Sequence, residues 1–249
     1  MVINGIIFIK YQSIKTSYLI LCYQVMINAL LSVLALIGVS VFLIIARWLY
    51  YRHLTVVSDA GRQRATTKTD ILIVVAIIAT TAIVLLVMGL TPWYKYGPIR
   101  LWSGDIKSNQ NSQQVADPYT FTHIIHGVGF YALLRLVPAP LSLGTRAILA
   151  VTAESAWEVF ENTDMVINRY RTATLSLDYY GDSVVNSVAD IITSMIGFFF
   201  AARFSTRVSI ILIILIEVIL AFTIRDNLFF NIFLLIYPVP AIKNWQLGG

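Results

Sequence analysis

Long apolar stretches alternate with short polar segments along this chain of 249 residues. A helix of about 20 apolar residues matches the roughly 30 Å hydrocarbon core of a bilayer. The runs 25–46 and 71–90 contain no charged residue, and four further runs carry polar residues at a few positions, namely 120–137, 147–162, 182–202 and 208–224. This pattern predicts an all-α fold, a polytopic transmembrane helical bundle of about six to seven spans.

Two apolar segments leave the number of spans open. Residues 228–237 are too few to cross a bilayer alone and end at Pro238. They form either a short last span, a re-entrant segment or an interfacial helix. Residues 2–23 are interrupted by Lys10 and Lys15, so they form an extra weak span, an interfacial helix, or an upstream extension if translation begins at Met26.

Composition supports a membrane protein. Hydrophobic residues make up 58% of the chain and charged residues 12%, with a mean hydropathy of +0.77, whereas soluble domains have about 25% charged residues. We therefore expect the lipid bilayer as the main partner and no nucleic acid. The single cysteine, Cys22, excludes an internal disulfide and a site with several cysteine ligands.

The basic residues indicate an orientation. The loop 47–69 carries five of them against one acid, Asp59. Because cytoplasmic loops are enriched in lysine and arginine, this loop is predicted to lie in the cytoplasm, with the chain crossing the membrane several times. We therefore interpret the net charge of +5 as a result of basic residues in membrane-flanking loops, which indicate orientation, and not as affinity for nucleic acid.

With that topology, polar residues from several helix ends fall at one depth on the outer side. Asp117 and Pro118 are expected to start a helix running inward, as N-cap and first helical residue, which places His123 and His126 in its outer third. The other polar residues expected at this depth are Glu154, Glu158 and Glu161 on one helix face, Asp182, Asn186 and Asp190 on another, and Arg225, Asp226 and Asn227.

These residues suggest a chemical site. An ionisable side chain at the bilayer centre costs roughly 2.5–3.5 kcal/mol on insertion scales, and such residues usually face a bundle interior or a cavity. We predict a divalent metal, zinc or iron, held by His123, His126 and Glu158. Glu161 and Asp190, together with these three, are the candidate catalytic residues, and Arg225 is the candidate ligand for an anionic headgroup.

Each feature also has a structural interpretation. The histidines could form interhelical hydrogen bonds, and the glutamates could pair with Arg169, Arg171 or Arg225. Asp182 is interpreted as a helix cap, and Gly127 and Gly129 as helix-packing residues. The remaining residues interpreted as structural polar groups are Glu154, Asn186, Asp226 and Asn227.

Four sequence blocks resemble a known family. They are "IRLWSGDIKSNQNSQQVADPYTFTHIIHGVGFYALLRLV", "AESAWEVFENTDMVINRYR", "LDYYGDSVVNSVADIITSMIGFFFAARF" and "IRDNLFFNIFLLIYPVPAIKNWQ". Together they resemble uncharacterised protein family 0314, also called domain of unknown function 2585, over about 71–246. The resemblance implies a multi-pass protein of the bacterial inner membrane and no particular activity. The block "GDSVVNSVADIITSMIGFFFA" is also weakly similar to VanZ-like membrane proteins.

The resemblance divides the chain in two. Residues 1–70 are expected to be a variable extension with one clear span (25–46) and the basic loop, and 71–246 to be the family-like membrane domain. Three functions remain open for that domain. It is a membrane enzyme whose metal or lipid-headgroup site acts on a lipid or an envelope small molecule, a proton-linked transporter or permeation protein, or a scaffold whose polar cluster is purely structural.

Overall fold

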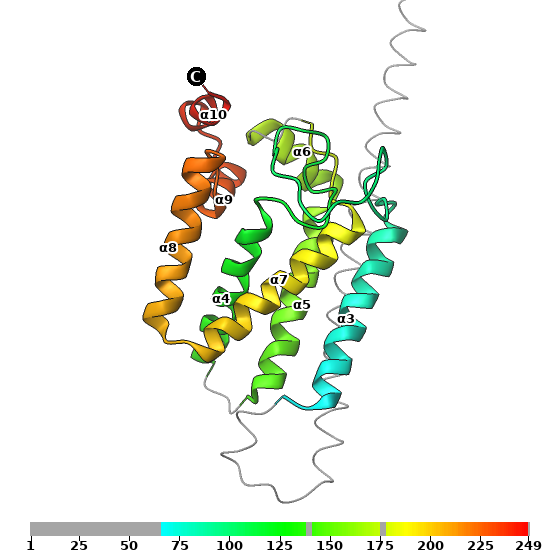
Figure 1. Ribbon diagram of the computed structural model, residues 1–249, viewed down its shortest axis with the longest axis vertical. Helices are drawn as coiled ribbons and strands as arrows, with labels where there is room; N and C mark the ends of the chain where they lie inside the picture. Colours follow the sequence, from blue (N-terminus) through cyan, green and yellow to red (C-terminus); the bar gives the residue numbers. More distant parts are fainter. Residues whose placement is uncertain (1–65, 138–140, 175–177, 249) are drawn as a thin grey trace, which may run out of the picture.

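The computed structural model describes residues 66–137, 141–174 and 178–248. The regular structure of these ranges consists of helices and includes no strand, which confirms the all-α prediction for them (Figure 1). The helices are α3 (Lys68–Val87), α4 (Thr120–Leu136), α5 (Leu143–Glu161), α6 (Asp164–Ala173), α7 (Val184–Arg203), α8 (Thr206–Thr223), α9 (Leu228–Ile236) and α10 (Pro240–Leu247). The predicted span 25–46 and the loop up to residue 65 lie outside the described residues.

Hydroxyl and amide side chains begin most of these helices. The first N–H groups of a helix have no intrahelical acceptor, and Ser, Thr and Asn at the N-cap supply one. The Thr67 hydroxyl accepts from the Asp70 N–H at 3.2 Å, and the Asp70 carboxylate accepts from the Thr67 N–H at 2.8 Å, which completes a capping box for α3. The other side-chain caps are Ser142, Thr163, Ser183, Ser205 and Asn227.

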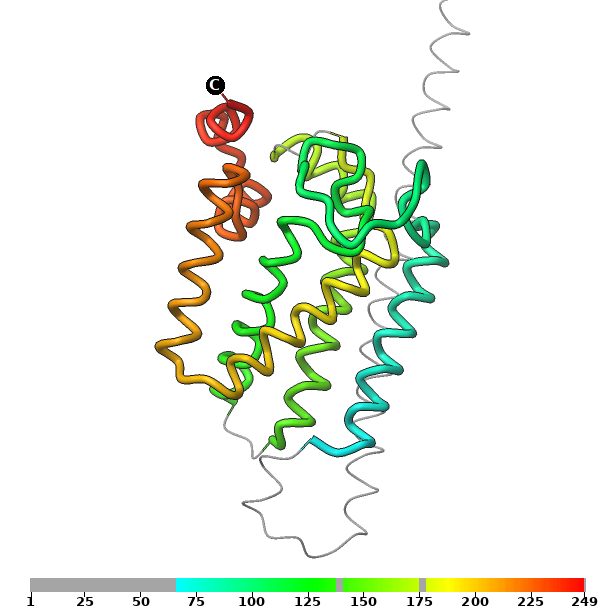
Figure 2. Tube along the Cα trace, viewed as in Figure 1, coloured from blue at the N-terminus to red at the C-terminus, as the bar shows by residue number. Residues whose placement is uncertain are grey.

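The long helices form a bundle with a polar end. In Figures 1 and 2, α3, α4, α5, α7 and α8 run along the long axis, while α6, α9, α10 and the 88–119 segment gather at one end. The first turns of α4 and α7 and the last turn of α5 all point to that end (Figure 1). The helix ends on which the polar residues were expected therefore meet at one end of the bundle (Figure 1).

Two glycines bring α4 and α7 into backbone contact, and α4 makes its main packing interface with α7. A Cβ on Gly127 would collide with the carbonyl oxygen of Ser194, and a Cβ on Gly197 would collide with the carbonyl oxygen of Ile124. A Cβ on Gly129 would meet nothing within 4 Å. The helix-packing interpretation is therefore confirmed for Gly127, whereas Gly129 makes no such close approach.

Three of the described helices are long and apolar enough to cross a membrane: α3, α7 and α8. On α8 only Ser209, Ile216 and Leu220 are buried, so most of its apolar side chains face outward. Apolar faces of this size suggest contact with lipid. α4 has 17 residues, and α5 carries Arg146 and three glutamates along its 19 residues. Residues 228–237 form the short helix α9 followed by Tyr237.

Two predicted helix starts differ from the structure. α4 begins at Thr120 rather than at Pro118, and the Asp117 carboxylate accepts from the N–H groups of Tyr119 (2.8 Å) and Thr120 (3.3 Å) in the turn before the helix. α7 begins at Val184, because the Ser183 hydroxyl accepts from the Asn186 N–H at 3.3 Å. The interpretation of Asp182 as the cap is therefore wrong.

Candidate functional site

The two histidines of α4 share one carboxylate of α5. His123 Nδ1 lies 2.5 Å from Glu154 Oε1, and His126 Nδ1 lies 3.2 Å from both Glu154 oxygens. The ring centroids are 5.0 Å apart. Glu154 is fully buried, so these contacts hold it away from solvent. The sequence assigned Glu158 to this histidine pair and a structural role to Glu154, whereas the structure places Glu154 between the two rings.

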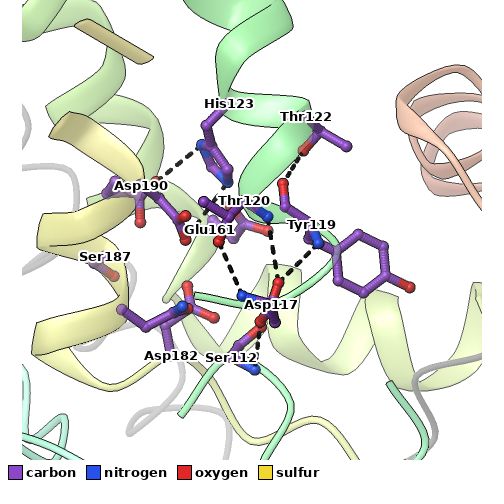
Figure 3. A network of polar contacts seen from close by, with 12 residues as sticks. Ser112, Asp117, Tyr119, Thr120, Thr122, His123, Glu161, Asp182, Ser187 and Asp190 are labelled. Atoms are coloured by element: carbon purple, nitrogen blue, oxygen red, sulfur yellow. Dashed lines mark hydrogen bonds and ion pairs between the residues drawn. The ribbon is translucent and has the colours of Figure 1, made fainter. Parts of the chain in front are cut away.

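A second group of ligand atoms joins three helices. His123 Nδ1 lies 3.5 Å from Glu158 Oε1, and His123 Nε2 lies 3.7 Å from Asp190 Oδ2. All three side chains are buried. Figure 3 shows His123 on α4 pointing toward Asp190 on α7. One potential ligand atom from each residue lies within 4.8 Å of the others, a spacing that a metal ion could bridge.

Several buried polar atoms in this group have no hydrogen-bond partner. They include both carboxylate oxygens of Glu158, Oδ1 of Asp190, and both polar atoms of the Asn186 amide. A buried carboxylate is costly unless hydrogen bonds or close opposite charges compensate for its lost hydration, and in the described residues the ion-pair partner of Glu158 and Asp190 is His123, which also contacts Glu154. The arrangement therefore favours an ion or ordered water between Glu158 and its neighbours.

A third group lies nearest the polar end. Glu158, Glu161 and Asp182 again place ligand atoms within 4.8 Å of one another. Glu161 accepts a hydrogen bond from the Tyr170 hydroxyl at 2.8 Å. Asp182 accepts from Asn162 Nδ2 at 2.8 Å and from the Tyr179 hydroxyl at 2.9 Å. Burial raises the pKa of Asp182 to about 6, although the Asn162 hydrogen bond acts in the opposite direction.

Asp117 lies between the loop that contains Ser112 and the start of α4. Its carboxylate accepts from the Ser112 N–H at 2.9 Å as well as from the start of α4, as Figure 3 shows. Burial raises the pKa of Asp117, while these backbone hydrogen bonds lower it by a smaller amount. Ser112 has a φ of +57°, a conformation that is rare for residues other than glycine. The loop is therefore bent sharply where it meets the site.

A pocket opens among these groups. It has a volume of about 50 Å³, and one water molecule needs about 10–15 Å³ by this kind of measure. The pocket therefore has room for a few waters or for a metal ion with a small ligand. The polar residues at its wall include His123, His126, Glu161, Tyr170, Asp182 and Asp190.

The arginines that could have neutralised the glutamates bind elsewhere. Arg169 donates to the carbonyl oxygens of Leu235 and Ile236, and Arg171 donates to that of Tyr179. In the described part of the chain, each ion pair of the cluster joins a histidine to a carboxylate. The interpretation of the glutamate face as a glutamate–arginine network is therefore wrong.

Arg225 is not brought to the histidine cluster. Its backbone has a φ of +54°, and its guanidinium donates to the Trp245 carbonyl at 3.1 Å. It lines a separate pocket with Asp105 and Lys107. The sequence placed Arg225 at the correct end of the bundle, but the structure does not unite it with His123.

Asp226 and Asn227 connect the polar end to the last helices. Asp226 Oδ2 accepts from the Tyr119 hydroxyl at 3.0 Å, and Asp226 Oδ1 accepts from Gln246 Nε2 at 2.9 Å. The Asn227 side chain accepts from the Phe230 N–H at 2.8 Å and thereby caps α9. Both residues therefore hold α9 and α10 against the start of α4.

Asp226 makes stability depend on pH. Burial raises its pKa from 3.8 to about 6, so the folded state binds this proton more tightly than the unfolded chain. The stabilisation is complete below about pH 4 and is lost as the pH rises through 6. A shift of about two pKa units corresponds to roughly 3 kcal/mol at most. In Asp226→Asn, the melting temperature measured in detergent should fall less between pH 4 and pH 7 than in the wild type.

The exposed Asp178 provides the control for this measurement. Asp178→Asn removes a carboxylate of the same type from the surface and should retain the wild-type slope. If Asp226→Asn and the wild type show parallel pH profiles, the protonation of Asp226 does not contribute to stability.

Some residues of the site were not anticipated from the sequence. Tyr170, Tyr179 and Asn162 hold Glu161 and Asp182 by hydrogen bonds. Asn162 follows Glu158 by four residues and Glu161 by one, so the helical spacing used for the glutamates would have included it. The tyrosines come from α6 and the segment before α7, and no periodic pattern marks them.

Comparison with known proteins identifies relatives along most of the chain. The family model described as "Protein of unknown function (DUF2585)" matches residues 85–248. A UPF0314 protein of Paracoccus denitrificans is 45% identical over 170 residues, 68% of this chain and 88% of the relative. Another from Sphingopyxis alaskensis is 43% identical over 182 residues, 73% of this chain and 97% of the relative. No solved structure matches the chain.

Proposed function

The chain belongs to the DUF2585 family, and we propose that it is a membrane enzyme in which His123, Glu158 and Asp190 hold a divalent metal ion. The observation that carries the proposal is Glu158, a fully buried carboxylate whose two oxygens have no hydrogen-bond partner. One of its oxygens lies within 4.8 Å of a ring nitrogen of His123 and of a carboxylate oxygen of Asp190. A cation between these groups would balance the charge that burial otherwise penalises.

The surroundings of His123 fit a metal ligand. A metal-bound histidine usually binds the ion through one ring nitrogen and gives the other to a carboxylate, which fixes the orientation of the ring. Here Nδ1 contacts Glu154 and Nε2 lies toward Asp190. Zinc and iron both bind histidine nitrogens and carboxylate oxygens, and such an ion can activate water when one coordination position stays open.

The pocket supports a hydrolytic reaction. When bound, the metal would lower the pKa of a coordinated water and polarise the bond to be broken. Glu161 lines the pocket and lies close to Glu158, so it is suited to accept the proton of the attacking water. Transfer of that proton to the leaving group would complete the hydrolysis of an ester or phosphoester bond.

The membrane setting completes the proposal. The bundle would contain six to seven spans, counting α4 and α5 and the predicted span 25–46. With the 47–69 loop in the cytoplasm, the polar end would face the envelope side of the inner membrane. In this arrangement 71–246 forms the enzyme domain and 1–70 an extension. The shared groups of carboxylates also suit a proton relay in a transporter, which is the second candidate.

Metal analysis of the intact protein tests the proposal. We expect about one divalent ion per chain after purification in detergent and exposure to zinc or ferrous iron. Asp190→Asn should lose most of this metal, because the amide is a poorer ligand than the carboxylate. Asp178→Asn makes the same change at an exposed position and should retain it. A wild-type protein without stoichiometric metal would contradict the proposal and favour the transporter, for which pH-dependent flux in liposomes is the readout.

A further inference from the structure

An apolar groove lies beside the polar pocket. It has a volume of about 890 Å³, within the range of ligand-binding sites. Its walls come from α4, α5, α6 and α9, and their side chains include Phe130, Trp157, Phe160, Met165, Ile232 and Leu235. Phe160 and Met165 are 41% and 56% exposed, so the groove opens to the outside of the bundle.

The groove and the polar pocket share part of their walls. His126, Trp157 and Ile232 line both. The His126 ring lies edge-on to Trp157, with centroids 6.0 Å apart, while its Nδ1 contacts Glu154. A molecule in the groove therefore reaches the histidine cluster without passing through the helix bundle.

We propose that the substrate is an acyl lipid of the surrounding bilayer, with its hydrocarbon chain in this groove and its polar head at the metal site. The inference rests on the proposed function and adds the substrate class to it. An acyl chain matches the apolar walls, and the bilayer supplies such chains where the groove opens. The ester and phosphate groups of the head carry the oxygen atoms that a divalent metal binds and polarises.

The division between the two cavities fits an amphiphile better than a water-soluble substrate. The polar pocket of about 50 Å³ is small and is lined by carboxylates. The groove beside it is much larger and has one charged wall residue, Arg169, whose guanidinium bonds the carbonyl oxygens of Leu235 and Ile236. A soluble polar molecule would gain little from such a groove, whereas an acyl chain could enter it from the bilayer at little cost, because both surroundings are apolar.

Photo-crosslinking of the full chain in nanodiscs tests this placement. The probe is phosphatidylglycerol with a diazirine in one acyl chain, diluted into unlabelled phosphatidylglycerol. We expect mass spectrometry to find the crosslinks concentrated on groove residues of α5, α6 and α9. Ala153 lines the groove and is exposed, so Ala153→Trp should obstruct it and reduce this labelling at least fivefold. Ala156→Leu, a smaller change in the same groove, should reduce labelling partially.

The control places the same side chain on another lipid-facing surface. Ile219 of α8 is 56% exposed and lies outside the groove, so Ile219→Trp should leave the groove labelling unchanged. Equal labelling of the wild type, Ala153→Trp and Ala156→Leu would overturn the inference, even if all three proteins bind metal normally. Labelling that is blocked by Ala153→Trp in a protein that binds no metal would overturn the proposed function and leave a lipid-binding groove.

Discussion

Gly127→Ala is expected to destabilise the bundle strongly, although alanine normally favours a helix. The added Cβ would collide with the Ser194 carbonyl oxygen and lie 2.6 Å from the Phe198 nitrogen, and both are backbone atoms that no side-chain rotation can move. Overpacking of a core typically costs about 1–3 kcal/mol, and a backbone collision belongs at or above the upper end of that range. Thermal unfolding in detergent measures the loss.

Gly129→Ala is the matched control. It makes the same substitution in the same helix, and its Cβ would meet nothing within 4 Å. Because alanine exceeds glycine in helix propensity by about 1 kcal/mol, this variant should be as stable as the wild type or slightly more stable. Equal melting temperatures for the two variants would show that α4 and α7 do not need their close approach.

The collision caused by Gly127→Ala should also disturb the proposed metal site. Gly127 lies one helical turn from His123, and Ser194 lies one turn from Asp190. Separation of α4 from α7 at this point would therefore draw His123 away from Asp190. Gly127→Ala should reduce metal binding together with stability, whereas Gly129→Ala should affect neither.

The sequence alone predicted which site residues share one face of a helix, because helical periodicity depends only on their spacing along the chain. Glu154 and Glu158 are four residues apart and share a face of α5, as the spacing indicated. The same spacing separates them by about 6 Å along the helix axis. The contact with both histidines depends on the relative height of α4 and α5, which periodicity does not contain.

The sequence also did not predict on which side of the bundle a residue lies. Arg225 was expected at the polar end and lies there, just after the end of α8, but its guanidinium donates to the Trp245 carbonyl. The depth of a residue follows from its position in a span, while its direction around the bundle follows from helix packing. Gly127 and Gly197 set that packing for α4 and α7, and their pairing across the interface was visible only in the structure.

Glu158→Gln is expected to separate stability from metal binding. In the metal-free protein, the substitution removes a buried charge whose oxygens have no hydrogen-bond partner. His123 Nδ1 contacts Glu154 at 2.5 Å and is only a distant partner of Glu158 at 3.5 Å, and glutamine has nearly the same volume as glutamate. The metal-free variant should therefore melt at the same temperature as the metal-free wild type or above it. The metal should stabilise the wild type by about 2.7 kcal/mol at 100 times its dissociation constant, or about 5–10 °C for a chain of this size. Glu158→Gln should lose that increase.

Glu217→Gln is the control, because Glu217 is a carboxylate that already has partners. It accepts from the N–H groups of Leu228 and Phe229 at 3.1 and 3.2 Å, so its replacement should weaken the start of α9 but preserve the metal-dependent increase. A purely structural cluster predicts the opposite pattern. Glu158→Gln would then lower the melting temperature without metal, and added metal would stabilise none of the three proteins. Since residues at functional sites are often retained at a cost in stability, a more stable Glu158→Gln variant that binds no metal would indicate that Glu158 serves function rather than folding.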